Sequence, residues 1–230
     1  MSKHLIHIFF LLLVIAKPYH AFTQTYEVGV TAGTSYYLGD LNPTTHFHEP
    51  QPAFGLFARY NVSNHISFRL NLNHGEISGS NEGTPYAVKG ASPGAFDFSA
   101  SITELSIQGE VNFLPFIAGD EDNRYTTYLF AGTGAFAFNS RVALPEKEEI
   151  NEDSMDRKYR RLSYLIGLGF KFHVTDKLTG GLDWGLRNTT TNQLDSAPGV
   201  GNPKIDDWYS FAGLSLTIRI RDRSCAVCPY

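Results

Sequence analysis

Charged side chains recur at the polar positions of stretches in which apolar and polar residues alternate. If these stretches line one narrow space, the carboxylates and cations inside it must pair, because an unpaired buried charge is costly. Such a set could form a path for protons or ions, but a structural network of ion pairs and hydrogen bonds is the simpler interpretation. We predict this structural role for Glu27, Arg59, Arg69, Glu110, Lys171, Asp183, Arg187 and Arg219.

Both cysteines, Cys225 and Cys228, lie at the C-terminal end of the sequence. A Cys-x-x-Cys redox centre normally opens a helix in a βαβ unit, and this pair lacks that setting, so oxidoreductase activity is not expected. Two pairings remain open, a local disulfide between the two cysteines or a disulfide to a partner protein. Arg221 and Arg223 make the preceding stretch basic, and Tyr230 is the last residue.

Histidines and acids also gather in one polar stretch, at Asp40, His46, His48 and Glu49. A His-x-His pair can bind a metal ion, and a histidine beside an acid can act in catalysis. Histidines in polar loops are more often simply solvated, and the sequence carries no Gly-x-Ser-x-Gly, zinc-ligand or phosphate-loop motif. We predict no catalytic residue, no metal site, no cofactor and no small-molecule substrate.

The elements that would position these side chains are β-strands, because their apolar residues recur at every second position. In residues 162–172, Leu162, Tyr164 and Ile166 share one face, while Ser163 and Lys171 fall on the other. A period of two excludes a helix. Segments of this kind are joined by connections that are alternately short and long, which is typical of a transmembrane β-barrel.

Eight segments are expected to be strands, at residues 26–37, 53–60, 66–79, 96–114, 125–139, 162–172, 178–187 and 211–220. In the first, Tyr36 shares the lipid-facing side with Tyr26. In the fourth, the apolar positions are even-numbered up to Ile102 and odd-numbered from Leu105, and a β-bulge near Thr103 or Glu104 would reconcile them. The faces of the fifth segment cannot be assigned. The predicted fold is all-β, an eight-stranded antiparallel transmembrane barrel.

Residues 1–24 are predicted to be a signal peptide. Lys3 and His4 make a weakly basic start, residues 5–16 are apolar, and Ala21 begins a plausible cleavage region. The apolar run is too short for a membrane-spanning helix, which needs about 20 residues. Residues 25–221 then form the barrel, and residues 222–230 form a tail.

Composition agrees with a barrel and argues against a nucleic-acid partner. Aromatic residues make up 13% of the chain and there are 21 glycines; aromatics form girdles at membrane interfaces, and small residues let strands pack closely. The net charge is -4, with acidic and basic residues intermixed, so no basic surface for nucleic acid is expected.

The number of strands predicts the orientation of the chain. Eight strands place both termini at one end, and bacterial barrels keep their short turns in the periplasm. The four long connections are then extracellular, and the tail lies in the periplasm. Side chains just fill the interior of an eight-stranded barrel, so a wide pore is not expected.

Several motifs resemble one family. Residues 26–43 (YEVGVTAGTSYYLGDLNP) resemble the opening strand and loop of the PorG-like outer-membrane barrels, components of the type IX secretion system of Bacteroidetes. Residues 112–116 (NFLPF), residues 128–139 (YLFAGTGAFAFN) and the ending Cys228-Pro229-Tyr230 are further likenesses. Cys225 has no counterpart in the family pattern.

The resemblance implies a non-enzymatic part of a protein-export machine that contacts a periplasmic ring of lipoprotein and periplasmic subunits. It implies a disulfide from Cys228 or Cys225 to that ring, with Arg221 and Arg223 assisting docking. The alternative is a stand-alone barrel of the outer membrane that contributes to envelope integrity or adhesion through its long loops.

Overall fold

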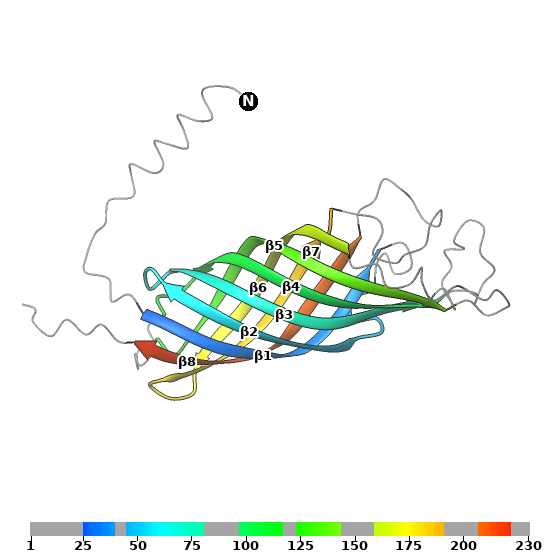
Figure 1. Ribbon diagram of the computed structural model, residues 1–230. Coiled ribbons are helices and arrows are strands. Elements are labelled where there is room, and N and C mark those ends of the chain that lie inside the picture. Colours follow the sequence, from blue (N-terminus) through cyan, green and yellow to red (C-terminus); the bar gives the residue numbers. More distant parts are fainter. Residues whose placement is uncertain are drawn as a thin grey trace, which may run out of the picture.

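The computed structural model describes residues 25–39, 45–80, 97–116, 123–143, 159–190 and 207–221. Each strand pairs antiparallel with the next, and the last strand closes onto the first (Figure 1). The strands are β1 (Thr25–Leu38), β2 (Gln51–Asn61), β3 (Ile66–Ser80), β4 (Asp97–Asn112), β5 (Tyr125–Ala143), β6 (Tyr159–His173), β7 (Leu178–Asn188) and β8 (Trp208–Arg221). The predicted eight-stranded antiparallel barrel is therefore confirmed.

The barrel has two distinct ends. β1 starts and β8 finishes at the same end, on the left of Figure 1. The β2–β3 and β6–β7 connections also lie there, and they are tight turns closed by Val62 N–H donating to Ile66 O and Val174 N–H donating to Leu178 O, each at 2.9 Å. We name this the turn end, and the opposite end, which carries the four long connections, the loop end.

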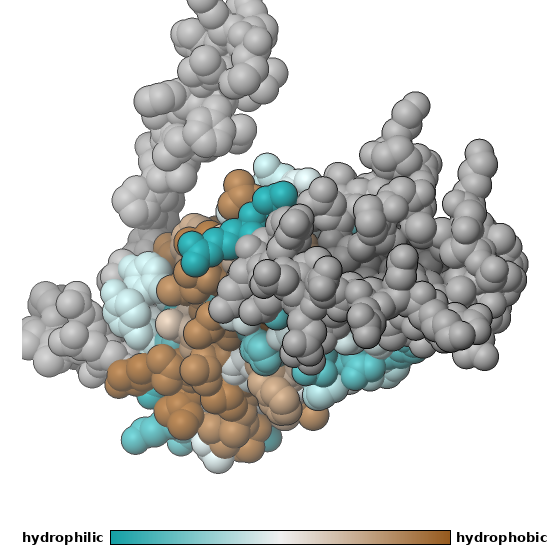
Figure 2. Space-filling model, turned by 45° about the vertical axis from the view of Figure 1, so that its right-hand side comes forward, coloured by the Kyte–Doolittle hydropathy of each residue, from teal (hydrophilic) through white to brown (hydrophobic). Residues whose placement is uncertain are grey.

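Toward the turn end, the outer wall of the barrel is apolar. Every second residue of each strand points outward there, as with Val30, Leu70 and Leu214, all of which are exposed. Tyr26 and Tyr125 are exposed aromatics at the rim. Figure 2 shows brown side chains gathered over this part of the wall. An apolar band with aromatic residues at its rim is the surface that bilayer hydrocarbon covers; we name it the apolar belt.

Three strands continue past the others at the loop end (Figure 1). The pairing of β2 with β3 stops at Ala53 and Gly75, whereas β3 and β4 remain paired up to Ser80 and Asp97. β5 likewise extends to Ala143, beyond its last pair with β6. We name this part of β3, β4 and β5 the projection. Its outward residues are polar, and Glu76 and Ser99 are exposed.

The predicted bulge in β4 is wrong. The register of β4 with both β3 and β5 runs unbroken past Thr103 and Glu104. The apolar residues change parity because they face inward up to Ile102 and outward from Leu105. A straight strand that passes from lipid into water needs this inversion, because lipid favours apolar side chains outside the barrel and water favours them inside.

Aromatic residues fill the barrel at its loop end. β5, whose faces the sequence left unassigned, points Phe136 and Phe138 inward, and the small Ala131 and Ala135 outward. We name the buried cluster at this level the aromatic core; it contains Tyr37, Ile77, Phe98, Ala100, Ile102, Phe136, Phe138 and Tyr209, with Phe211 packed against it. The aromatic core has the same cause as the change of parity in β4. At the loop end the outer wall is polar, and the apolar side chains point into the barrel.

Strand bounds differ from the prediction mainly at the loop end. β2, β6 and β8 begin earlier than expected, at Gln51, Tyr159 and Trp208. The proposed signal peptide and the tail beyond residue 221 lie outside the described residues. No helix of a length and apolarity suited to crossing a membrane occurs in the described part of the chain.

Candidate functional site: the charged lumen

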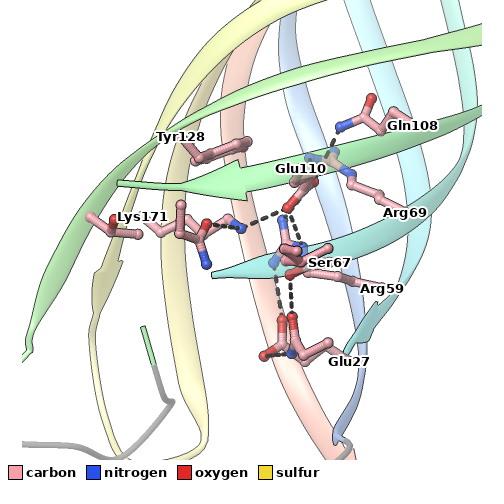
Figure 3. A network of polar contacts seen from close by, with 12 residues as sticks. Glu27, Arg59, Ser67, Arg69, Gln108, Glu110, Tyr128 and Lys171 are labelled. Carbon is pink, nitrogen blue, oxygen red and sulfur yellow. Dashed lines mark hydrogen bonds and ion pairs between the residues drawn. The ribbon is translucent and has the colours of Figure 1, made fainter. Parts of the chain in front are cut away.

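Glu110 on β4 is the centre of a buried ionic network in the lumen (Figure 3). Its carboxylate is 0% exposed and has three cations around it. Lys171 Nζ lies 2.6 Å from Oε2, Arg59 Nε lies 3.0 Å from the same oxygen, and Arg69 NH1 lies 3.8 Å from Oε1. Gln108 donates a further hydrogen bond to Oε1 at 3.1 Å.

Two further carboxylates balance these cations. Glu27 Oε2 accepts a hydrogen bond from Arg59 NH1 at 3.0 Å, and Asp183 Oδ2 accepts one from Arg69 NH1 at 2.9 Å. Tyr128 donates its hydroxyl to the other oxygen of Asp183. The Glu110 network therefore contains Glu27, Arg59, Arg69, Glu110, Lys171 and Asp183, with three acids and three bases, so its charge is balanced.

The network reaches the turn end of the barrel through Asn112. Lys171 donates to Asn112 Oδ1 at 3.1 Å, and the amide group of Asn112 donates to the backbone oxygen of Asn64 at 3.0 Å. Asn112 N–H also donates to His65 O at 2.7 Å. Asn112 thus joins the ionic network to the β2–β3 turn, which helps to fix the end of β4.

A second buried network lies closer to the loop end, around Glu104 on β4. Tyr209 on β8 donates its hydroxyl to Glu104 Oε2 at 2.5 Å, and Arg187 Nε lies 3.5 Å from the same oxygen. Ser106 and Asn73 donate to the other oxygen of Glu104 at 3.0 and 3.3 Å. We name this the Glu104 network. Because Tyr209 also belongs to the aromatic core, it joins the polar and apolar parts of the lumen.

Little open space remains between these side chains. A cavity of about 50 Å³ lies between the two networks, lined by Arg69, Asn71, Gln108, Asp183 and Arg187 among others. This volume holds a few water molecules and is well below that of a typical ligand pocket of roughly 300 Å³ or more. The ionic networks and the aromatic core occupy the lumen between the described strands, so the arrangement stabilises the barrel, and this part of the chain leaves no wide path through it.

The structure brings together most of the charged residues selected from the sequence. Six of them form the Glu110 network, while Arg187 belongs to the Glu104 network. Arg219 pairs in register with Glu27 on β1 and is half-buried. Sequence reasoning missed Glu104 and Tyr209. Glu104 has the same parity as Glu110 on β4, but the predicted bulge near Thr103 or Glu104 leaves the face of Glu104 undefined.

The other candidate residues give no second site. Cys225, Cys228, Arg223 and Tyr230 lie outside the described residues, as does Asp40, and Arg221 is described only as the last residue of β8. His48 and Glu49 lie 3.7 Å apart on the β1–β2 connection. Within the described ranges, no group of three or more His, Cys, Asp or Glu side chains is placed to hold a metal ion.

Solved structures of similar shape share the barrel at low sequence identity. The attachment invasion locus protein Ail of Yersinia pestis, solved with the heparin analogue sucrose octasulfate, is 10% identical, with a TM-score of 0.50 over 86% of this chain and 100% of Ail. Neisserial surface protein A is 11% identical, with a TM-score of 0.53 over 85% of this chain and 97% of that protein. These likenesses show the fold, a closed barrel of the outer-membrane type.

Sequence comparison places the chain in a family. A comparison with curated proteins found no match. A family model described as "Domain of unknown function (DUF6089)" matches residues 3–230, nearly the whole sequence. The chain belongs to the DUF6089 family.

Proposed function

We propose that this protein is a non-enzymatic barrel of the bacterial outer membrane and a component of the type IX protein secretion system. In this role the barrel docks the ring of lipoprotein and periplasmic subunits that the secretion system has in the periplasm. One observation carries the proposal. Ion pairs and the aromatic core fill the lumen, while β8 ends at Arg221 on the turn end. A filled barrel does not conduct, so its contribution must come from its surfaces and from the segment that follows β8.

The outer wall supports the placement in a membrane. Exposed side chains such as Leu56, Ile107 and Ile166 would be unfavourable in water, and the closed barrel leaves no strand edge unpaired at their level. An even number of antiparallel strands with short turns at one end and long loops at the other is the pattern of bacterial outer-membrane barrels. By that pattern the turn end faces the periplasm, and the segment after Arg221 starts there.

The chemistry of that segment suits a protein partner. Arg221 and Arg223 supply positive charge for an acidic surface, and Cys225 and Cys228 can form a disulfide in an oxidising compartment. The resemblance of Cys228-Pro229-Tyr230 to the ending of the PorG-like barrels supports a covalent or docked contact with the secretion ring.

Affinity purification from crosslinked cells tests the proposal. The full chain is compared with a version that stops after Arg221, which leaves β8 complete. We expect the full chain to recover periplasmic and lipoprotein subunits of the secretion system, and the shortened chain to lose them at an equal level of folded barrel. Recovery of no secretion subunit by the full chain would overturn the proposal.

The covalent link has its own test. Non-reducing electrophoresis compares the wild type with Cys225→Ser, Cys228→Ser and the double variant. If one cysteine bonds the ring, a band of higher mass vanishes in that variant and in the double variant. If the two cysteines pair locally, no such band exists, and docking without a disulfide remains as the proposed contact.

A stand-alone role at the cell surface is the second candidate. The projection carries a polar outer wall beyond the level of the apolar belt, so it would stand outside the membrane and be available to other molecules. The shared fold of Ail, an attachment invasion locus protein solved with a heparin analogue, makes adhesion the natural form of this role. Deletion of the gene distinguishes the two candidates, because only the export role predicts that secreted proteins accumulate in the periplasm.

A further inference from the structure

Tyr36 is an outward-facing residue that is nonetheless completely buried. It has the same parity on β1 as the exposed Tyr26, Val28 and Val30, and the sequence predicted that it would face lipid, yet it is 0% exposed. The β1–β2 connection covers it from outside. The ring of Phe47 lies 4.8 Å from the ring of Tyr36, and the His46 ring meets it edge-on at 6.1 Å.

A fourth ring joins this cluster from β7. Trp184 donates its indole N–H to the Tyr36 hydroxyl oxygen at 2.9 Å, and the same hydroxyl lies 3.2 Å from His46 Nδ1. The Trp184 and His46 rings are 5.6 Å apart. β8 lies between β1 and β7, and it carries the short side chains of Ser210 and Ala212 at this level. Because these side chains are small, Tyr36 and Trp184 can meet above them.

The backbone of the connection is held in an unusual conformation to make these contacts. Phe47 and Glu49 have φ angles of 58° and 47°. This left-handed region is unfavourable for residues with bulky side chains and persists only where the surroundings enforce it. In this conformation the Phe47 ring packs against Tyr36 in a tilted arrangement, at an interplanar angle of 42°, and 52% of the residue stays exposed. An exposed aromatic ring held in this way suggests a contact outside the barrel.

The strand register relates the cluster to the apolar belt. Ala32, Leu214 and Leu182 form one row across β1, β8 and β7, within the apolar belt. The next row toward the loop end contains Trp184, and the row after it contains Tyr36. Leu186 of β7 lies in the same row as Tyr36. The four rings therefore belong to the loop-end part of the apolar wall, and tryptophan and tyrosine concentrate where such a wall meets the membrane–water boundary.

We propose that residues 45–49, seated on Tyr36 and Trp184, form a membrane-contact element whose Phe47 ring inserts into the lipid headgroup layer next to the long-loop end of the barrel. The partner is the lipid surface itself. The segment lies against the outer wall through Tyr36 and presents the exposed Phe47 ring beside the loop-end part of the apolar belt, so the ring and the belt face the same lipid surface. The inference rests on the membrane placement proposed above and is independent of the export role.

Tryptophan fluorescence tests the contact in the full chain. The protein has two tryptophans, Trp184 and Trp208. Both are changed to Phe, which keeps a ring at position 184, and Phe47→Trp supplies the only emitter. The protein is reconstituted in phosphatidylcholine vesicles, either plain or brominated on the acyl chain close to the headgroup. We expect the bromine atoms to quench this emission, and iodide in the water to quench it weakly.

Two further reporters in the same background make the result decisive. Phe54→Trp lies on the exposed apolar belt and must lose emission to the brominated lipid if the barrel is inserted. Ser99→Trp, on the outer wall of the projection, must respond to iodide alone. If position 47 behaves like position 99 while position 54 is quenched by bromine, the membrane-contact element is wrong. If position 54 itself escapes bromine, the membrane placement fails instead.

A second measurement keeps the native Trp184 of the cluster as the emitter. Trp208→Phe alone leaves Trp184 as the single emitter beside the native Phe47. We expect the brominated lipid to quench Trp184. Phe47→Ala should increase the quenching of Trp184 by iodide, because it removes the ring that seats residues 45–49 on Tyr36 and thereby loosens the His46 ring packed against Trp184. Equal iodide quenching with and without the Phe47 ring would overturn the proposal.

Discussion

Lys171 and Glu110 meet inside the barrel although their strands are not neighbours. β5 separates β6 from β4, yet Lys171 Nζ lies 2.6 Å from Glu110 Oε2. The ammonium group passes over the ring of Tyr128 on β5, 4.1 Å from its centroid, which adds a cation–π attraction. Contacts that skip a strand tie the wall together through the lumen, in addition to the hydrogen bonds between adjacent strands.

Glu110→Gln should destabilise the barrel strongly. The change keeps the shape of the side chain but leaves three buried cations with two carboxylates. Loss of one member of a buried ionic group lowers the free energy of unfolding by about 3–5 kcal/mol. Urea unfolding of the reconstituted protein measures the free energy of unfolding. Glu76→Gln, at an exposed position on β3, is the matched control and should change it little. Equal effects at the two positions would contradict a structural role for the network.

Tyr209→Phe should weaken the Glu104 network without opening a cavity. The variant removes only the hydroxyl that donates to Glu104, so a buried carboxylate loses one donor, at a cost of about 1–3 kcal/mol. Tyr125→Phe removes the same group from an exposed ring at the rim. In the same unfolding assay we expect a clear loss at position 209 and almost none at position 125.

Two glycines in neighbouring strands should respond in opposite ways to alanine. A Cβ atom on Gly132 would lie 2.0 Å from the backbone oxygen of Ile107, whereas one on Gly109 would meet nothing nearer than Phe68 at 3.9 Å. Gly132→Ala must push β4 and β5 apart and should cost about 1–3 kcal/mol or more. Gly109→Ala should be neutral or stabilise by about 0.4–1 kcal/mol, since it restricts the unfolded chain. A folded Gly132→Ala barrel of unchanged stability would disprove the close approach.

The inversion of polarity along β4 predicts where a charge is tolerated on the outer wall. Ile107→Arg places a cation in the apolar belt and should cost about 2–4 kcal/mol near the middle of the bilayer. Ser99→Arg points outward from the same strand at the polar level of the projection, and should be tolerated. Unfolding of both variants in lipid vesicles measures the difference. Similar costs at both positions would mean that the membrane boundary does not lie between them.

Part of the lumen could be predicted because strand parity decides which side chains face inward. Once β1, β2 and β3 are recognised, Glu27, Arg59 and Arg69 must point into the barrel. Parity says nothing about which charges meet, since this depends on barrel closure and on the tilt of the strands. The pairing of Arg69 with Asp183, from β3 and β7, follows from that closure alone.

Alternation of apolar and polar residues, repeated in eight segments with short and long connections, was sufficient to determine the barrel, because a strand has only two faces and each residue must take one of them. The tertiary structure decided what surrounds each face. It showed that the apolar parity of β4 reverses without a bulge, and that Tyr36 is covered by Phe47 from outside the barrel. Sequence spacing specifies the face of a side chain, but only folding in three dimensions determines whether lipid, water or another segment of the chain lies against it.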